Sequence, residues 1–137
     1  MKRNATAVWH GTLKEGKGHL STQSGVLQQT PYTYKMRFED EKGTNPEELV
    51  GAAHSGCFSM QLSAYLAEKG YKPVELETKA EVTLESGTVT SSHLTLKAKV
   101  PGISHDQFNE LVTKAKENCP ISKLLKAEIS VDATLNE

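Results

Sequence analysis

The sequence has only two cysteines, Cys57 and Cys119, and they lie far apart in the chain. A thioredoxin-like protein would carry Cys-x-x-Cys, and zinc modules carry closely spaced cysteine pairs, so the usual signatures of both classes are absent. A phosphate-binding glycine-rich loop is also missing. In a reducing compartment two cysteines are poor candidates for a permanent structural bridge. The pair is therefore buried and inert, metal-binding or redox-active.

Long runs of one residue type are absent as well. No apolar stretch approaches the roughly 20 residues that a membrane-spanning helix needs, so we expect no membrane partner. The basic first residues are not followed by the apolar stretch and cleavage site of a secretory signal, which predicts a cytoplasmic protein. The 16 Lys and Arg nearly balance the 17 Asp and Glu. Without a long run of either sign, the chain has no electrostatic footprint for nucleic-acid binding.

The 137 residues fit a single domain, 1–137, with one core. Period-two alternation predicts strands in the segments 6–10, 18–22, 32–38, 74–84, 94–100 and 129–133. Helical periodicity and capping residues predict helices over 46–69, 105–119 and 120–125. Strands and helices in this order, without regular βαβ alternation, predict an α+β fold.

The longest predicted helix has a clear start. Asn45 can cap it, Pro46 suits the first helical position, and Glu48 stands where a capping box places a carboxylate. We expect the core-facing stripe of this helix to hold residues at helical spacing, namely Leu49, Ala53, Gly56, Met60 and Ala64. A second face carries small residues on which a partner helix could lie, namely Gly51, Ser55 and Ser59.

Cys57 lies on this helix among small residues that leave room for a ligand to approach its sulfur. An inert core cysteine is the alternative. Cys119 directly precedes Pro120, at the cap of a short helix, where the helix dipole favours a thiolate; packing on the preceding helix is its alternative. His54 precedes Cys57 by one helical turn, so a Cys-His nucleophile pair and a metal site that includes Cys119 are further options.

Two charged residues could assist a thiolate. Arg37 could lower the pKa of a cysteine and hydrogen-bond a peroxide oxygen, and Glu47 could hold Arg37 in a bidentate ion pair. The alternatives are a solvated charge on a strand face and a first-turn carboxylate that complements the helix dipole. On an unbroken helix Glu47 lies about 15 Å from Cys57 along the axis. Either the helix breaks near a glycine or the site combines Cys57 with charges from another chain, and we favour the second.

Two stretches, TNPEELVGAAHSGCFSM at 44–60 and NCPIS at 118–122, resemble the signature segments of the OsmC/Ohr family. This family comprises the osmotically inducible and organic hydroperoxide resistance proteins. Arg37, in YKMRF at 34–38, resembles the strand arginine of the OsmC branch. The chain departs from many relatives at Ser55-Gly56, where they have two alanines, and this difference concerns helix packing more than chemistry.

The resemblance implies an OsmC-like fold, with antiparallel sheets packed around a long central helix, and an intertwined homodimer. It implies a peroxidase that reduces organic hydroperoxides to alcohols in stress defence. Cys57 would be the peroxidatic thiol and Cys119 the resolving thiol that forms a disulfide with it, assisted by Arg37 and Glu47. No metal or bound cofactor is required, and an external dithiol, which can be lipoyl-type in relatives, would reduce the disulfide.

Apolar neighbours of Cys57 would suit an alkyl or lipid hydroperoxide, namely Phe58, Met60 and Leu62. The main alternative function is a non-catalytic stress-response dimer that binds small apolar molecules, with both cysteines merely packed. A Cys-His hydrolase is a third option, and it would not need Cys119.

Overall fold

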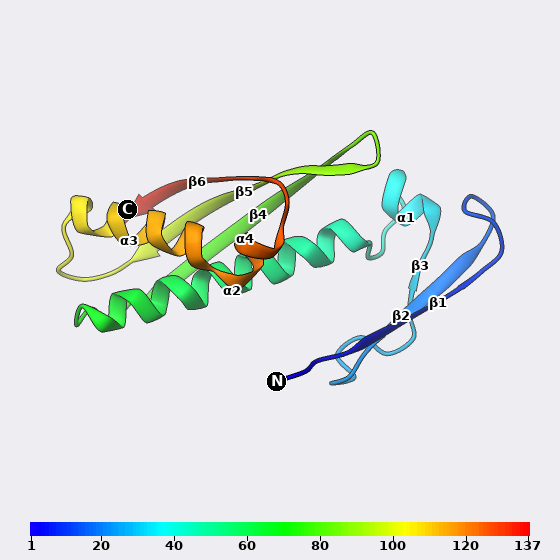
Figure 1. The fold of residues 1–137 in the computed structure, drawn as a ribbon, viewed down its shortest axis with the longest axis horizontal. Coiled ribbons are helices and arrows are strands. Elements are labelled where there is room, and N and C mark those ends of the chain that lie inside the picture. The colour runs from blue at the N-terminus through cyan, green and yellow to red at the C-terminus, as the bar shows by residue number, and fades with distance from the viewer. The chain divides into compact units, whose positions relative to one another are not determined.

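The computed structural model describes residues 1–137 and combines helices with two small sheets, which confirms the predicted α+β class. The chain divides into two compact units, Met1–Leu49 and Val50–Glu137. Figure 1 traces the elements of each unit along the chain. A single domain over the whole chain stays a prediction. None of the helices combines the length and the apolar character that crossing a membrane requires.

The first unit contains a three-stranded antiparallel sheet. Its strands, in spatial order, are β1 (Ala5–His10), β2 (Lys17–Thr22) and β3 (Thr30–Tyr32). The rings of Trp9 and Tyr32 pack edge to face with centroids 5.3 Å apart. A methyl group at Gly18 would collide with both rings, so this position requires glycine. The first two predicted strands are confirmed.

The predicted strand that contained Arg37 is wrong. After β3 the chain turns into a short helix, α1 (Tyr34–Phe38). Thr33 causes the change, because its hydroxyl accepts a hydrogen bond from the backbone N–H of Met36 and caps the helix. The first and last residues of the helix, both aromatic, stack one turn apart with centroids 4.9 Å apart. Arg37 therefore projects from a helix and not from a strand face.

The second unit packs helices against a mixed sheet. The elements are α2 (Pro46–Glu68), which begins in the first unit, and β4 (Glu75–Glu85), β5 (Thr88–Lys99), α3 (His105–Asn118), α4 (Pro120–Leu124) and β6 (Glu128–Leu135). The burial of β4 alternates residue by residue, so one face of this sheet is covered. In Figure 1, α2 and α3 run beside the sheet.

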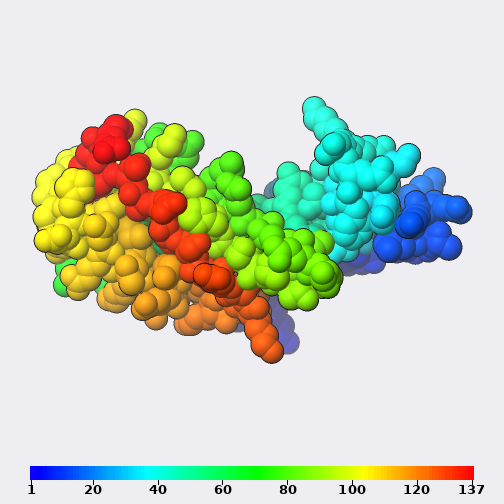
Figure 2. All heavy atoms as spheres, turned by 90° about the horizontal axis from the view of Figure 1, so that it is seen from above, coloured from blue at the N-terminus to red at the C-terminus, as the bar shows by residue number.

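Strand pairing corrects the expectation of purely antiparallel sheets. β4 and β5 form an antiparallel hairpin, and Ser86 and Gly87 at its turn both have positive φ angles. β6 instead pairs in parallel with β5, and its red residues lie across the face seen in Figure 2. The reason is the connection: α3 and α4 carry the chain back along the sheet, so β6 starts at the same end as β5.

The face of α2 that enters the core also differs from the predicted stripe. Its buried residues are Gly51, His54, Phe58, Leu62 and Leu66. Met60 is 78% exposed, and a Cβ built on Gly56 would meet no atom within 4 Å beyond the adjacent backbone of its own helix. The helix has two stripes of apolar or small residues, and the core takes the one with the larger side chains. These pack against core residues of β5, of the position directly after it and of α3, which include Leu94, Leu96, Val100, Phe108, Leu111 and Ala115.

The small-residue face predicted for a partner helix is turned toward the sheet. A Cβ on Gly51 would lie 3.5 Å from the carbonyl oxygen of Ala80. The hydroxyl of Ser59 lies 2.7 Å from that of Thr78 on β4. This face is therefore occupied within the chain itself, and that expectation was wrong.

Candidate active site

The two cysteine sulfurs meet in the second unit. Cys57 projects from α2, and the thiol of Cys119 lies 3.0 Å from its sulfur. Both residues are free thiols; Cys119 is fully buried and Cys57 is partly exposed. Because a disulfide bond is about 2.05 Å long, the sulfurs need to approach by only about 1 Å to form one. The structure thus brings together two residues that the sequence placed far apart.

Local structure explains where Cys119 lies. α3 buries one face against the core. Cys119 caps the C-terminal end of this helix, and its backbone N–H donates a hydrogen bond to the carbonyl of Ala115 at 3.0 Å. Pro120 begins α4, and the backbone N–H of Ser122 points to the Cys119 sulfur at 3.5 Å. The predicted cap position of Cys119 is confirmed.

The surroundings of Cys57 raise the pKa of its thiol. Burial is the largest cause, and the hydrogen bond and charge of Cys119 act in the same direction. A hydrogen bond from the backbone N–H of Ile121 opposes them. Since the thiolate is the reactive form of cysteine, these surroundings within the second unit disfavour the form that would react.

Arg37 and Glu47 form a bidentate ion pair in the first unit. The Arg37 Nε donates to both carboxylate oxygens of Glu47, at 2.9 and 3.2 Å, and a terminal guanidinium nitrogen lies 2.8 Å from Oε1. The side chain of Glu47 is 13% exposed and that of Arg37 is 35% exposed. The pairing expected of these two residues is therefore present, and the guanidinium keeps part of its surface open.

Asn45 sets the geometry of this ion pair. Its side-chain oxygen accepts the backbone N–H of Glu48 at 2.8 Å, which caps α2 as predicted. Its side-chain nitrogen donates to the carbonyl of Met36 in α1 at 3.3 Å. One residue thus links the short helix that carries Arg37 to the first turn that carries Glu47.

Glu47 and Cys57 lie on one unbroken helix. This helix runs from Pro46 to Glu68 without a break, so the alternative of a break near a glycine is wrong. At about 1.5 Å per residue, Glu47 and Cys57 are separated by about 15 Å along the axis.

His54 does not pair with Cys57. It is fully buried, its Nδ1 lies 2.6 Å from the Ser92 hydroxyl, and its Nε2 lies 2.8 Å from the Ser122 hydroxyl. Both ring nitrogens are occupied, so a Cys-His nucleophile pair is not formed. No group of three or more His, Cys, Asp or Glu side chains is arranged to hold a metal ion.

Sequence reasoning missed both serines and the backbone N–H of Ile121. Ser122 stands three residues after Cys119, the spacing at which a backbone N–H meets a capping side chain, and this signal could have been read. Ser92 carried no comparable signal, because its partner comes from a distant part of the chain.

His54 predicts a pH dependence of stability. Burial lowers its pKa below the ordinary value of 6.5. As the pH falls, the unfolded chain therefore takes up a proton at His54 before the folded chain does. The stability that the neutral His54 contributes is fully present above pH 6.5 and is lost as the pH falls below 6.5. We expect the free energy of unfolding to decrease over that interval by at most about 1.4 kcal/mol per pH unit from this residue.

Urea unfolding of the parent and of His54→Gln between pH 5 and pH 7.5 checks this prediction. Glutamine offers one donor and one acceptor but does not titrate. The variant should show a shallower loss of stability with acid. Identical slopes for both proteins would show that His54 does not resist protonation.

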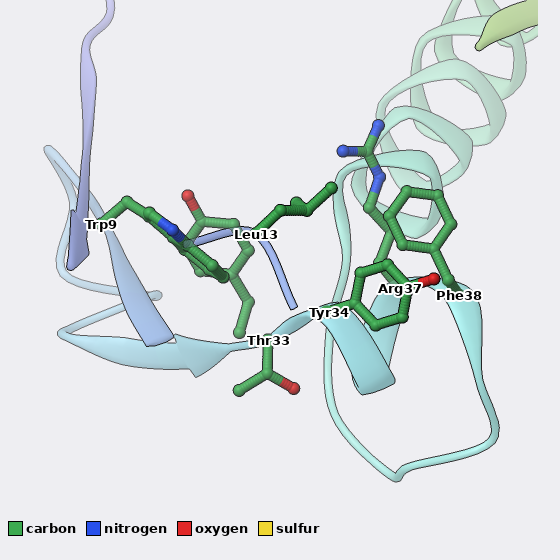
Figure 3. A pocket seen from close by; sticks show the side chains of 7 residues that line it. Trp9, Leu13, Thr33, Tyr34, Arg37 and Phe38 are labelled. Atoms are coloured by element: carbon green, nitrogen blue, oxygen red, sulfur yellow. The ribbon is translucent and has the colours of Figure 1, made fainter. Parts of the chain in front are cut away.

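A pocket of about 200 Å³ lies in the first unit, beside Arg37. Its lining is mainly aromatic and apolar, with one cation, and consists of Trp9, Leu13, Tyr32, Thr33, Tyr34, Arg37 and Phe38. Figure 3 shows Trp9 at one end of this group and Arg37 at the other, with Leu13 between them. The guanidinium carbon of Arg37 lies 4.9 Å from the centre of the Phe38 ring. The arrangement suits an apolar molecule with one polar end.

Residues 39–134 match the family model described as OsmC-like protein. The chain belongs to the OsmC-like family. It is 48% identical to the peroxiredoxin OsmC of Escherichia coli (strain K12), with 97% of this chain and 96% of that protein covered. It is 29% identical to the organic hydroperoxide resistance protein OhrB of Bacillus subtilis (strain 168), over 90% of this chain and 93% of that protein.

Solved structures confirm the OsmC-like fold. An OsmC-like protein from Mycoplasma pneumoniae aligns with a TM-score of 0.77 over 100% of this chain and 99% of its own, at 16% identity. The structure of OhrB from Bacillus subtilis aligns with a TM-score of 0.67 at 25% identity, covering 97% of this chain and 98% of that chain. Both alignments include the N-terminal strands, which the family model does not match.

Proposed function

We propose that this OsmC-like protein is a thiol-dependent peroxidase that reduces organic hydroperoxides to alcohols. The observation that carries the proposal is the contact of Cys57 with Cys119 at 3.0 Å, with Cys57 reachable and Cys119 buried behind it. Relatives across most of the chain are named peroxiredoxin and organic hydroperoxide resistance protein. Two thiols in contact, in a family with such members, fit peroxide reduction better than passive packing.

The chemistry balances with these two residues and the substrate. The Cys57 thiolate attacks one peroxide oxygen, the O–O bond breaks, and the leaving alkoxide takes a proton to become the alcohol. The sulfenic acid of Cys57 then reacts with the Cys119 thiol, which forms the disulfide and releases water. An external dithiol, of a lipoyl type in our proposal, returns the disulfide to two thiols. The cycle requires no bound cofactor or metal, and we place it in the cytoplasm.

The activating charge, we propose, comes from a second copy of the chain in a homodimer. Arg37, held by Glu47, would face Cys57 of the partner, lower the pKa of that thiol and stabilise charge on the leaving oxygen. Such a cation would counter the rise in the pKa of Cys57 that burial and Cys119 cause.

Two further observations support a homodimer. In the first unit Gly18 is the only buried residue, so its aromatic side chains have no core of their own. On α2, the stripe that was expected to face the core is exposed around Gly56 and Met60. A second copy would cover both surfaces, since apolar groups gain free energy when they leave water.

The aromatic pocket beside Arg37 is our candidate for the organic part of the substrate. Phe58 and Leu62, which were expected to contact the substrate, are fully buried in the core and are not among the residues that line this pocket. An alkyl or aryl group in the pocket would leave its hydroperoxide near the guanidinium, which donates hydrogen bonds to oxygen.

A mass measurement after one equivalent of cumene hydroperoxide tests the proposed function. The chain should lose two hydrogen atoms, and digestion without reductant should yield one peptide pair joined through Cys57 and Cys119. A dithiol should restore the original mass. An unchanged mass with the hydroperoxide still present would favour the alternative, a non-catalytic dimer that binds small apolar molecules.

A further inference from the structure

We propose that His54 is a positioning residue that keeps Cys119 in reach of Cys57 by fixing α4 through Ser122. This inference rests on the proposed function and concerns its second step, the formation of the disulfide. The evidence is the buried hydrogen bond of 2.8 Å between the His54 Nε2 and the Ser122 hydroxyl.

α4 has little else to hold it. It contains five residues, and Ser122 is the only buried one. Leu124 is 73% exposed, and Ile121 is only partly buried against the core. By contrast, α3 buries four apolar residues. The bond to His54 is therefore the main polar anchor of this short helix.

α4 directly contacts both sulfurs. The backbone N–H of Ser122 lies 3.5 Å from the Cys119 sulfur, and the backbone N–H of Ile121 hydrogen-bonds Cys57. Cys119 itself is the residue between α3 and α4, so any displacement of α4 rotates its backbone. The hydrogen bond from His54 to Ser122 thus holds α4 about one helical turn from the resolving thiol.

His54 is itself well fixed. It projects from α2 one turn before Cys57, and its other ring nitrogen bonds Ser92 on β5 at 2.6 Å. β5 is the central strand of its sheet. α4 is therefore tied to the same helix that carries Cys57 and to the centre of the sheet.

The positioning matters because the sulfenic acid of Cys57 has two fates. It can condense with the Cys119 thiol, which forms the S–S bond and releases water, or react with a second hydroperoxide to give the irreversible sulfinic acid and an alcohol. The first fate requires the sulfurs to approach from 3.0 Å. A loosened α4 would slow the first fate and leave the second unchanged.

The test compares Ser122→Ala with Ser59→Ala under single-turnover oxidation by cumene hydroperoxide. Ser59 lies on the same helix as Cys57 and also hydrogen-bonds a partly buried neighbour, Thr78 on β4. In Ser122→Ala, disulfide formation should slow about tenfold, the effect of losing roughly one hydrogen bond. The sulfinic fraction at Cys57, measured by mass, should rise with hydroperoxide concentration. Ser59→Ala should keep the parental partition.

A second pair of variants keeps the test decisive if Ser122→Ala does not fold. His54→Gln retains one donor and one acceptor, whereas His54→Leu retains neither. Only His54→Gln should therefore keep the parental ratio of disulfide to sulfinic acid. Equal partition in Ser122→Ala, Ser59→Ala and the parent, or in both His54 variants and the parent, would overturn the proposal. Failure of the proposed function looks different, because the parent itself would then not consume hydroperoxide.

Discussion

Replacing Cys57 with serine is expected to lower dithiol-dependent reduction of cumene hydroperoxide by about 10³-fold or more, the scale of removing a catalytic nucleophile. Serine is close in shape, but its hydroxyl is not ionised near neutral pH and cannot form a sulfenic acid. Fold and stability should change little, because the Cys57 side chain lies partly at the surface. The measurement is the rate of hydroperoxide loss with excess dithiol.

Cys119→Ser provides the matched control. This variant keeps the first step, so one equivalent of hydroperoxide should still be consumed quickly and leave a sulfenic acid on Cys57 that a trapping reagent detects. If Cys57→Ser consumed hydroperoxide as fast as the parent, Cys57 would not be the reacting thiol. An acyl-transfer activity that survives the loss of Cys119 would instead support a Cys-His hydrolase, although both ring nitrogens of His54 are already bonded.

Features that depend on local chemistry were predictable from the sequence. Asn45 caps α2, Ser104 caps α3 with the backbone N–H of Gln107, and Cys119 with Pro120 starts α4. Helix caps can be predicted because the donor and acceptor are three residues apart and their hydrogen bond depends little on the rest of the fold. The same reasoning, applied to Thr33, would have corrected the strand predicted around Arg37.

Features that depend on distant contacts were not predictable from spacing. α2 carries two stripes of apolar or small residues, so periodicity alone does not tell which one faces the core. The parallel pairing of β6 follows from the path of α3 and α4, and the contact of Cys57 with Cys119 from the packing of α3 on the core. Only the family segments pointed to that contact, through the implied peroxidatic and resolving roles.

Replacing Arg37 with methionine is expected to reduce the rate of Cys57 oxidation by about 10²-fold, the usual scale for losing one preorganised group that stabilises developing charge. Burial and Cys119 raise the pKa of Cys57, and the guanidinium that we propose beside it would counter this rise. Arg37→Lys keeps the charge but loses the bidentate hydrogen bonding to Glu47. Its rate of Cys57 oxidation should lie between those of the parent and of Arg37→Met. Stopped-flow measurement of the first step, without dithiol, gives these rates.

Mixing two inactive variants then tests whether the charge crosses between chains. Cys57→Ser chains retain Arg37, and Arg37→Met chains retain Cys57. If Arg37 acts on the partner, each mixed dimer has one complete site, and random exchange of subunits should restore about a quarter of the parental activity, since half of the dimers are mixed. If Arg37 acts on Cys57 of its own chain, no mixed dimer contains a complete site. Activity that stays at the level of the separate variants, with subunit exchange verified by mass, would therefore reject the shared site.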